Sequence, residues 1–421
     1  MKILVVSQYF YPEQFRINDV CFRLAEMGHE IVVLTGLPNY PEGKIFDGFD
    51  WASLHAVGKY DPKLDACCET HLGVQIIRCN LRPRLSGKKN LALNYVSFMK
   101  RGSKVAKKIT TEFDKILVFQ YSPVTMAIPA VKYQKQILKK AGDKPPLYLY
   151  CFDLWPESIV SAGLSNHGLI YTAVKMLSKW IYKKADKIFV SSKLFEKYFD
   201  QKLDISGNIQ YLPIYAEDLF CHTTAANNNN DGDDDGDCVR LLFAGNIGEM
   251  QSVDTILRAA ALLQDANAAV HIDIVGDGSS LDKCKSLSAE LKLENVTFHG
   301  RYPLEAMPIF YNIADAFLIT LKDDPFISYT LPNKVQPYMA AGKPLIASIN
   351  GEVAELVTES NCGLVCPAED HRSLAENILK FIAEKEKHSF YGTNASTYYD
   401  ENFSADVFFS RLFSYMDEDK A

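Results

Sequence analysis

The hydrophobic positions of this chain gather in short continuous runs, and the segments between the runs have the spacing of amphipathic helices. Before residue 222 the runs are KILVVS, HEIVVLTG, GVQIIRC, DKILVFQ, LYLYCFD, KIFVSS and IQYLP; after residue 238 they are RLLFAGN, VHIDIVGDG, VTFHG, AFLITL, KPLIAS and GLVCP. Apolar runs without alternation are typical of parallel strands that are buried on both faces by helices. The pattern predicts an α/β protein with two Rossmann-like, doubly wound parallel sheets that face a central cleft.

A polar, low-complexity segment separates the two sets of runs. It has the sequence TTAANNNNDGDDDGDC, Thr223 to Cys238, and lacks the apolar periodicity needed to form a core. We therefore expect a first domain at residues 1–216, a linker at 217–238 and a second domain at 239–399. The length of 421 residues also favours two domains over one.

The acids of this linker match the first half of an EF-hand calcium loop. The matching residues are Asp231, Asp233, Asp235 and Gly236. The glutamate that closes such a loop would fall on Leu242, inside a predicted strand. Calcium binding is therefore the weaker interpretation, and we expect no metal.

The composition is that of a globular protein, with 48% hydrophobic and 23% charged residues. No apolar run approaches the ~18 residues that cross a bilayer. The start, MKILVVSQYF, runs straight into aromatic and charged residues, which favours a first strand over a signal peptide. The ten cysteines show no metal-binding spacing, so we expect reduced thiols and a cytoplasmic location.

Positive charge is concentrated in the first half of the chain. Residues 1–222 contain 30 Lys and Arg against 21 Asp and Glu, a net charge of +9, whereas residues 223–421 contain 15 against 31, a net charge of −16. From Arg78 to Lys108 there are ten Lys and Arg and no acid. This basic region is either a solvated helix face or a patch that rests on an anionic membrane. We expect no nucleic-acid partner.

Two glycine turns follow successive strands of the second half. The first turn contains Gly245, Asn246, Ile247 and Gly248, and the second contains Gly276, Asp277 and Gly278. Glycines at strand ends let the backbone approach a phosphate, although tight strand-to-helix turns would also use them. Neither turn completes a dinucleotide fingerprint, which argues against an NAD-dependent oxidoreductase.

Cations follow the later strands of the second half. Gly300, Arg301 and Tyr302 come after one strand, and Pro332, Asn333 and Lys334 open a helix that ends near Gly342. A cation at a helix N-terminus is disfavoured unless an anion joins it. Lys334 is therefore either a diphosphate ligand or an ordinary solvated lysine.

These motifs resemble a known family. FAGNIGEMQSVDTIL, IVGDGSSL, VTFHGRYPLEAMPIFYNIADAFLITL and LPNKVQPYMAAGKPLIA resemble, in order and spacing, the donor domain of family 4 retaining glycosyltransferases. QYFYPE, GHEIVVLTGLPNYPEGK and DLWPES are similar to its WbuB-like subgroup of bacterial polysaccharide, O-antigen and capsule transferases. The resemblance covers nearly the whole chain except the Asn/Asp-rich linker.

The resemblance implies a GT-B fold and a hexosyltransferase activity without metal or other cofactor. The second domain would bind a nucleotide-sugar, usually UDP-linked, and the first a lipid-diphosphate-linked saccharide. The last helix, at about 400–421, would cross back onto the first domain. The transferred sugar would be an N-acetylated or deoxy hexose, and the enzyme would lie peripherally on the cytoplasmic face of the inner membrane.

The chain departs from the broad family at four donor positions. Asn246 and Gln251 stand where most members have Arg and Lys, and Tyr329 and Pro337 stand where they have two glutamates. The usual ribose-binding carboxylate is therefore missing, and Glu352 or Glu355 is a candidate replacement. Lys334 and Arg301 remain as the cations for the diphosphate.

The family places an acid or a histidine after the strand LYLYC, facing the reactive carbon of the sugar. Here Asp153 stands there, and it would orient the acceptor hydroxyl, accept its proton or stabilise developing positive charge. Alternatively, Asp153 only caps the helix that Pro156 opens. The remaining acceptor candidates are Tyr11, Glu13, Arg16, Asn39, Tyr40, Arg82, Trp155 and Glu157.

Two other functions stay open beside the transferase. A GT-B nucleotide-sugar epimerase would need acids and histidines deep in the cleft and no acceptor site. A catalytically silent protein would bind the nucleotide-sugar as a sensor or a partner subunit, which the four changed donor positions would allow.

Overall fold

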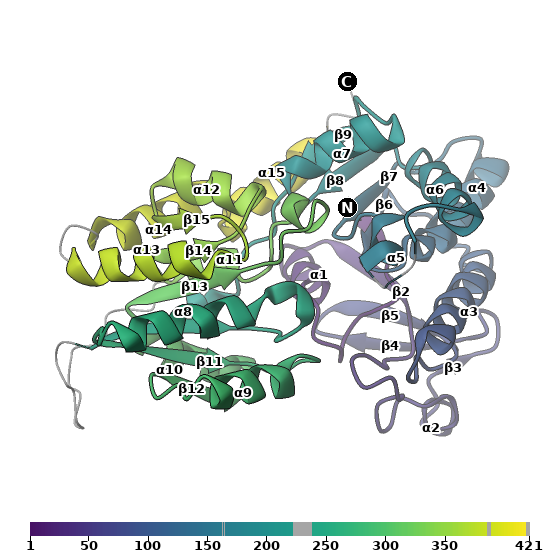
Figure 1. The fold of residues 1–421 in the computed structure, drawn as a ribbon. Coiled ribbons are helices and arrows are strands. Elements are labelled where there is room, and N and C mark those ends of the chain that lie inside the picture. The colour runs from purple at the N-terminus through teal and green to yellow at the C-terminus, as the bar shows by residue number, and fades with distance from the viewer. Residues whose placement is uncertain (162, 164, 222–237, 385–388, 418–421) are drawn as a thin grey trace. The chain divides into compact units, whose positions relative to one another are not determined.

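The computed structural model describes residues 1–161, 163, 165–221, 238–384 and 389–417. It divides into a first unit, Met1–Ser191 with Glu196–Tyr211, and a second unit, Ser192–Phe195 with Leu212–Ala421 (Figure 1). Most of the expected linker, including the calcium-like acids, lies outside the described residues. The domain limits at 216 and 238 and the return of the last helix to the first domain stay predictions.

The first unit is built on one nine-stranded sheet. The strand order is β3-β4-β5-β2-β1-β6-β7-β8-β9, and all pairs are parallel except β3 with β4 and β4 with β5. The strands are β1 (Lys2–Val6), β2 (Glu30–Gly36), β3 (Tyr60–Asp61), β4 (Ala66–His71), β5 (Val74–Cys79), β6 (Lys115–Gln120), β7 (Leu147–Cys151), β8 (Lys187–Val190) and β9 (Ile209–Tyr211).

Helices connect the parallel strands of this sheet. They are α1 (Arg16–Glu26), α2 (Trp51–Ala56), α3 (Lys88–Ala106), η1 (Val124–Ala127), α4 (Ile128–Ala141), α5 (Glu157–Ser161) and α6 (Leu169–Tyr182), followed by α7 (Lys193–Leu203), whose first residues belong to the second unit. α3 and α4 pack against each other (Figure 1). Among the described residues, no helix has both the length and the apolar character that a membrane span requires.

The second unit is built on a six-stranded, all-parallel sheet. The strand order is β12-β11-β10-β13-β14-β15. The strands are β10 (Val239–Ala244), β11 (Val270–Val275), β12 (Val296–Gly300), β13 (Ala316–Thr320), β14 (Leu345–Ser348) and β15 (Gly363–Cys366). The helices are η2 (Asp218–Phe220), η3 (Glu249–Gln251), α8 (Val253–Asp265), α9 (Leu281–Glu290), η4 (Leu304–Ala306), α10 (Met307–Ile313), η5 (Ile327–Tyr329), α11 (Val335–Ala340), α12 (Glu352–Ser360), α13 (His371–Ala383), α14 (Ser389–Asn402) and α15 (Ala405–Asp417).

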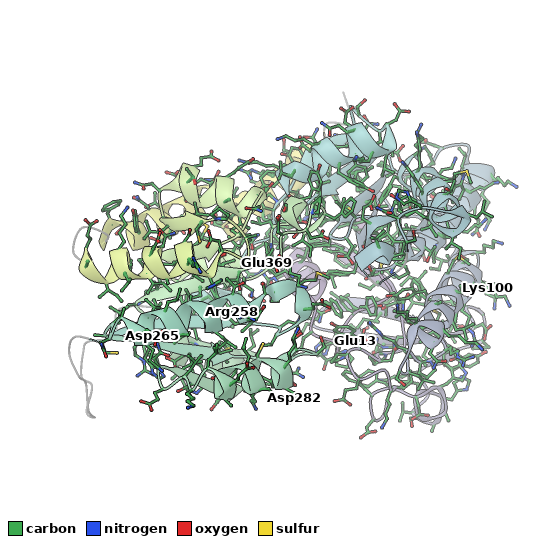
Figure 2. All side chains as sticks on the ribbon, in the orientation of Figure 1. Glu13, Lys100, Arg258, Asp265, Asp282 and Glu369 are labelled. Atoms are coloured by element: carbon green, nitrogen blue, oxygen red, sulfur yellow. The ribbon has the colours of Figure 1, made fainter. Side chains whose placement is uncertain are left out.

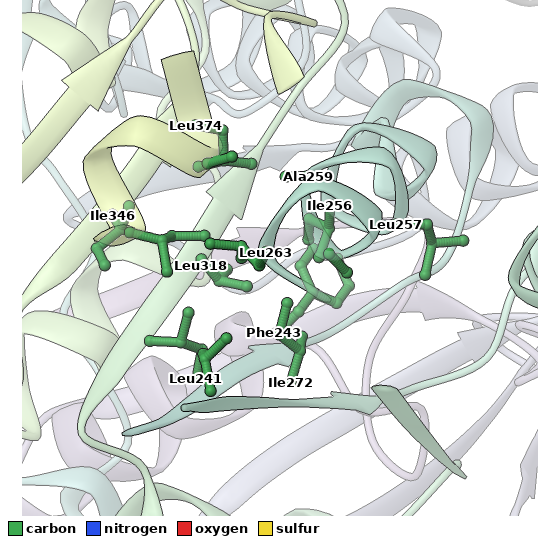
Figure 3. Close-up of a cluster of buried hydrophobic side chains, with 14 of the residues drawn as sticks. Leu241, Phe243, Ile256, Leu257, Ala259, Leu263, Ile272, Leu318, Ile346 and Leu374 are labelled. Carbon is green, nitrogen blue, oxygen red and sulfur yellow. The ribbon is translucent and has the colours of Figure 1, made fainter. Parts of the chain in front are cut away.

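Helices cover both faces of the second sheet. On one face, side chains of α8 and α13 such as Ile256, Leu263 and Leu374 pack on strand residues such as Leu241 and Leu318 (Figure 3). Successive side chains of a strand point to opposite faces. The neighbour of Leu318 on β13, Phe317, accordingly stacks with Tyr338 of α11 on the other face, with ring centroids 4.3 Å apart.

All the apolar runs of the sequence form strands, which confirms the predicted α/β class with two parallel sheets. The hairpin of β3 and β4 was missed. β4 has the sequence ACCETH, whose burial declines along the strand, so no continuous apolar run marks it. It pairs antiparallel with β5 on one side and with the short edge strand β3 on the other, and an antiparallel strand can have one solvated face on which polar residues are tolerated.

Candidate functional site

The candidate site of the second unit begins where β10 and β11 end. Ala244 is paired with Val275, so Gly245 and Gly276 leave the sheet side by side. Gly276 has a φ of 149°, and a Cβ there would lie 1.8 Å from the carbonyl oxygen of Gly245. The close approach of the two turns therefore requires glycine at position 276.

Backbone hydrogen bonds join these turns to each other and to the turn after β12. The amide of Ile247 donates to the carbonyl of Asp277 at 2.8 Å, and the amide of Gly276 donates to the carbonyl of Gly300 at 2.8 Å. A Cβ on Gly278 would lie 2.5 Å from the Ile247 carbonyl oxygen. The structure thus brings together the two glycine turns that the sequence singled out and Gly300, which ends β12.

Lys334 lies beside Gly245, immediately before α11. Its Nζ is 3.9 Å from the centroid of the Phe243 ring, and a Cβ on Gly245 would lie 3.4 Å from the same nitrogen. This Nζ is buried and has no hydrogen-bond partner among the described residues. Burial lowers the pKa of Lys334 to about 7. A buried, unpaired amine is costly until an anion joins it, so the arrangement suits a phosphate group.

Tyr338 fixes the end of β10 against α11. Its hydroxyl accepts a hydrogen bond from the amide of Ala244 at 2.7 Å and donates one to the carbonyl of the same residue at 3.0 Å. The sequence gives no functional signal for this residue, because a tyrosine at an apolar position of a helix indicates only core packing. Tyr338 thereby positions the strand end from which Gly245 continues.

Two of the changed donor positions are also near this strand end. Asn246 is exposed, and the carbonyl of Gln251 accepts a hydrogen bond from Thr320 Oγ1 at 2.6 Å. The Oε1 atom of Gln251 is buried and has no partner among the described residues. Neither side chain carries the charge that most of the family has here, which leaves Lys334 as the buried cation of these turns.

The remaining donor candidates differ in their surroundings. Arg301 is exposed and forms no ion pair with a described residue, whereas the ring of Tyr302 packs edge-on against Phe310 of α10 at 4.8 Å. Pro332 is half-buried and Asn333 is exposed, directly before Lys334. A diphosphate role for Arg301 stays a prediction.

Glu352 has a structural task that the sequence did not reveal. Its Oε1 accepts from the amide of Lys193 at 2.9 Å, and its Oε2 accepts from the amide of Leu194 at 2.9 Å and from Ser192 Oγ at 3.0 Å. These groups open α7, so Glu352 satisfies the free amides of that helix. Ribose binding by Glu352 would have to displace this cap, which leaves Glu355 as the exposed carboxylate of the two.

In the first unit, Glu13 is buried near the end of the loop between β1 and α1 (Figure 2). Its Oε1 accepts from the amides of Asn39 and Tyr40 at 2.7 Å each, and its Oε2 accepts from the amide of Phe10 at 3.2 Å. Burial raises the pKa of Glu13 to about 7, although these three hydrogen bonds oppose the rise. Glu13 therefore positions the loops after β1 and β2. Its direct contact with an acceptor stays a prediction.

Asn39 extends this buried network to a third loop. Its Oδ1 accepts from the amide of Arg84 at 2.9 Å and from Asn94 Nδ2 at 3.3 Å. Gln8 Nε2 in turn donates to Asn94 Oδ1 at 2.6 Å. Asn39 thus positions loops as well, and Gln8 and Asn94 are further members of the network that no sequence pattern predicts.

Asp153 and Trp155 converge on Ser122. Ser122 Oγ donates a hydrogen bond to Asp153 Oδ2 at 2.5 Å. Ser122 Oγ also accepts one from Trp155 Nε1 at 3.1 Å. Burial raises the pKa of Asp153, and the hydrogen bond from Ser122 opposes the rise. Among the described residues, no amide of α5 donates to this carboxylate, so the capping alternative is not supported. Ser122 is the second residue after the strand β6, so reading the residues just after each strand would have found it.

Glu157 joins helices of the first unit. Its Oε1 accepts from the hydroxyls of Tyr171 and Tyr198 at 2.8 Å each, and only 3% of the residue is exposed. Its Oε2 is buried and has no partner among the described residues. Two tyrosine hydroxyls already occupy Oε1 of Glu157. The predicted binding of acceptor hydroxyls by Glu157 would therefore have to use Oε2.

The other acceptor candidates lie nearer the surface. Tyr11 stacks on His71 with ring centroids 3.8 Å apart, and Tyr40 is 37% exposed. Arg16 forms an ion pair on the first turn of α1, and Arg82 is exposed. Their contact with an acceptor stays a prediction.

The predicted basic patch needs one correction. Arg78 is only 1% exposed, and it donates to Glu69 and to the carbonyl of Tyr11 at 2.6 Å each, so it belongs to the interior. The prediction was wrong because charge alone does not show which face of β5 a side chain occupies. Lys100 lies on the outer side of α3 (Figure 2). The exposed cations of the region are Arg82, Lys88, Lys89, Lys100, Arg101, Lys104, Lys107 and Lys108.

Metal ligands do not gather in the part of the chain that the structure describes. No group of three or more His, Cys, Asp or Glu residues there has metal-binding geometry. The expectation of a metal-independent site stays a prediction.

Solved structures identify the class of fold. Sucrose-phosphate synthase from Thermosynechococcus elongatus superimposes with a TM-score of 0.70 at 16% identity, covering 98% of this chain and 99% of that one. HepE from Anabaena, solved in complex with UDP, gives a TM-score of 0.66 at 14% identity, covering 99% and 100% of the two chains. The chain therefore has the GT-B fold.

The sequence identifies the family. Residues 227–397 match the family model for glycosyl transferases group 1. The probable glycosyltransferase WbjE of Pseudomonas aeruginosa is 27% identical over 235 residues, which are 55% of this chain and 58% of WbjE. The putative colanic acid biosynthesis glycosyl transferase WcaI of Escherichia coli K12 is 21% identical over 363 residues, or 81% and 82% of the two chains. The predicted resemblance is confirmed.

Proposed function

We propose that this chain is a retaining glycosyltransferase that moves a sugar from a UDP-linked donor to a lipid-linked saccharide during synthesis of a cell-surface polysaccharide. The observation that carries the proposal is the buried Nζ of Lys334 beside the glycine turns, which has no partner among the described residues. A diphosphate there would gain a cation and lie against close-packed backbone. The UDP complex of HepE and the colanic acid assignment of WcaI support the donor and the pathway class.

The transfer would need little covalent chemistry from the protein. The bond between the anomeric carbon and the phosphate oxygen breaks, and the bond to the acceptor oxygen forms on the same face of the sugar. The acceptor proton passes to the leaving phosphate, whose negative charge Lys334 would stabilise. Asp153, held by Ser122, would orient the acceptor hydroxyl or stabilise positive charge on the sugar.

Thermal unfolding with UDP, GDP, ADP and NAD, each in large excess, tests the donor site. A ligand at about 100 times its dissociation constant adds ~2.7 kcal/mol to the free energy of unfolding. We expect a shift with UDP that Lys334→Met abolishes and that Lys380→Met, an exposed lysine of the same unit, leaves intact. A shift with NAD alone would overturn the proposal.

Transfer itself is measured with labelled UDP-sugars and a lipid-linked acceptor, and the product's anomeric configuration by NMR. Release of UDP with a retained configuration is the expected result. UDP binding without release would identify a silent member, and an epimerised UDP-sugar without transfer would identify an epimerase.

A further inference from the structure

Helix α6 exposes its apolar side to solvent. The exposed fractions are 90% for Leu169, 66% for Ile170, 63% for Met176, 36% for Leu177 and 43% for Trp180. These positions follow helical spacing, so they form one stripe along the helix. An amphipathic helix of a globular domain normally turns this stripe towards the core.

The buried side of the same helix contains Ser178, Ile181 and Tyr182. Ser178 and Tyr182 are fully or almost fully enclosed, at 0% and 1% exposure. Ser178 Oγ donates to the carbonyl of Val174 at 2.8 Å. The helix is therefore already anchored in its domain, and the stripe is free for another partner.

Positive charge predominates around the stripe, although Lys179 of α6 forms an ion pair with the exposed Asp204 at 3.1 Å. The helices α3, α4 and α6 contain no Asp or Glu. Lys184, just after α6, lies 5.6 Å from the centroid of the Trp180 ring. The Lys and Arg residues of the three helices are Lys88, Lys89, Lys100, Arg101, Lys104, Lys132, Lys135, Lys139, Lys140, Lys175 and Lys179.

A groove connects the stripe to the basic region. It has a volume of about 720 Å³, and Trp180 of α6 lines it together with residues of α3 and α4. Val96, Met99 and Ile128 supply apolar surface, and Lys132 and several cations of α3 supply charge. Apolar and cationic side chains thus alternate over one continuous surface of the first unit.

We propose that α6 docks on an anionic lipid bilayer, with its apolar stripe inserted among the head groups and the cations of α3 and α4 facing the lipid phosphates. The positive surface charge favours a bilayer as the partner. Helices with many cations and no acid are complementary to the densely charged surface of an anionic membrane. The inference deepens the proposed function by naming the surface that would bring the enzyme to a lipid-linked acceptor. Vesicle binding is measured without sugar transfer, so either proposal can fail alone.

The two components of binding respond differently to salt. Each cation near an anionic surface strengthens binding about fivefold at low ionic strength, and salt screens this contribution. Insertion of apolar side chains persists in salt, and loss of two large ones should weaken partition at least about tenfold. A purely electrostatic patch would instead lose all vesicle binding as the salt concentration rises.

The experiment is co-sedimentation with vesicles of phosphatidylglycerol and phosphatidylethanolamine, at low and high salt, using the full chain. The test variant is Ile170→Asn with Met176→Asn. The matched control is Ile309→Asn, because Ile309 is 65% exposed on α10 of the second unit. Quenching of tryptophan fluorescence by brominated lipid reports insertion, with Trp180→Phe to identify the quenched residue.

We expect wild-type protein and Ile309→Asn to bind equally, the double variant to bind at least about tenfold more weakly, and the quenching to disappear in Trp180→Phe. Equal binding of the double variant would overturn the proposal, as would a wild-type chain that stays in solution with all vesicles. A wild-type dimer that the double variant converts to a monomer, measured by analytical ultracentrifugation, would show that the stripe contacts a second copy and would also overturn it.

Discussion

The side-chain amine of Lys334 lies in buried surroundings that disfavour its charged form. Its Nζ lies over the Phe243 ring, its Cε and Nζ lie beside Gly245, and no described residue supplies an acceptor. Sites prepared for a ligand often lower stability in its absence. The same lysine would therefore cost stability in the free protein and contribute affinity when a diphosphate is bound.

Replacing this lysine by methionine should separate the two effects. Without nucleotide, Lys334→Met should be at least as stable as the wild type, because methionine keeps the packing on Phe243 and removes the buried amine. Chemical denaturation measures the free energy of unfolding. If Lys334→Met clearly lowers the free energy of unfolding without nucleotide, Lys334 stabilises the folded protein through a contact of its own.

The binding of UDP should weaken as the pH rises above neutrality. The pKa of Lys334 is about 7 in the free protein, so the amine is charged below that pH and neutral above it. A bound diphosphate favours the charged form and raises the pKa, so binding takes up a proton where the free amine is neutral. Isothermal titration calorimetry from about pH 7 to 9, in buffers of different ionisation enthalpy, measures this uptake. Uptake that persists in Lys334→Met would assign it to another group.

Asp153 offers a test on the acceptor side. Asp153→Asn should lower turnover ~100- to 1000-fold while leaving UDP affinity unchanged, because one well-placed charge is lost outside the donor site. Ser122→Ala keeps the carboxylate and should lose less activity. Turnover at the wild-type rate in Asp153→Asn would remove this residue from the mechanism.

Residues that follow a strand were predictable, and residues that bond to distant backbone were not. Gly245, Lys334 and Asp153 were found because strand ends and helix starts can be located from apolar runs. Glu352 caps a helix about 160 positions away in the chain, at Ser192, a contact that no local pattern encodes. Glu13 likewise binds amides of a loop that only the fold brings near.

At the scale of elements, the turns after β10 and β11 act as one unit, and glycine 276 is their most restricted position. Gly276→Ala would place a Cβ at 1.8 Å from the Gly245 carbonyl, with a φ of 149° that L side chains rarely adopt. We expect the free energy of unfolding to fall by about 2 kcal/mol or more, with loss of UDP binding. Gly342→Ala, where φ is 69° and the nearest atom is 3.7 Å away, is the control for φ alone. Equal effects of the two substitutions would contradict the steric argument.

The elements themselves show where periodicity stops being informative. The buried parallel strands were all found, but β4 was not, because an antiparallel strand with one solvated face has no continuous apolar run. For α6, spacing indicates that Leu169, Met176 and Trp180 share one side. It does not show that this side is exposed, because burial depends on what the fold places against it.

At the scale of the whole molecule, two separate cores should respond differently to nucleotide. Lys334 and the glycine turns all belong to the second unit. UDP at about 100 times its dissociation constant should stabilise that unit by ~2.7 kcal/mol and leave the first unit unchanged. Differential scanning calorimetry should therefore show one transition that moves with UDP and one that does not. Equal movement of both would mean that the units unfold as one cooperative body.

The joined turns also limit how proteins with this site can diversify. The amide of Ile247 donates to Asp277 at 2.8 Å, and its carbonyl accepts from Ser280 at 2.9 Å, so the length of each turn is fixed against the other. An inserted or deleted residue in one turn would break hydrogen bonds in both. New sugar preferences should therefore arise by exchange of side chains on a frame of constant length, and evolutionary change at these turns should take the form of substitutions and not of gaps.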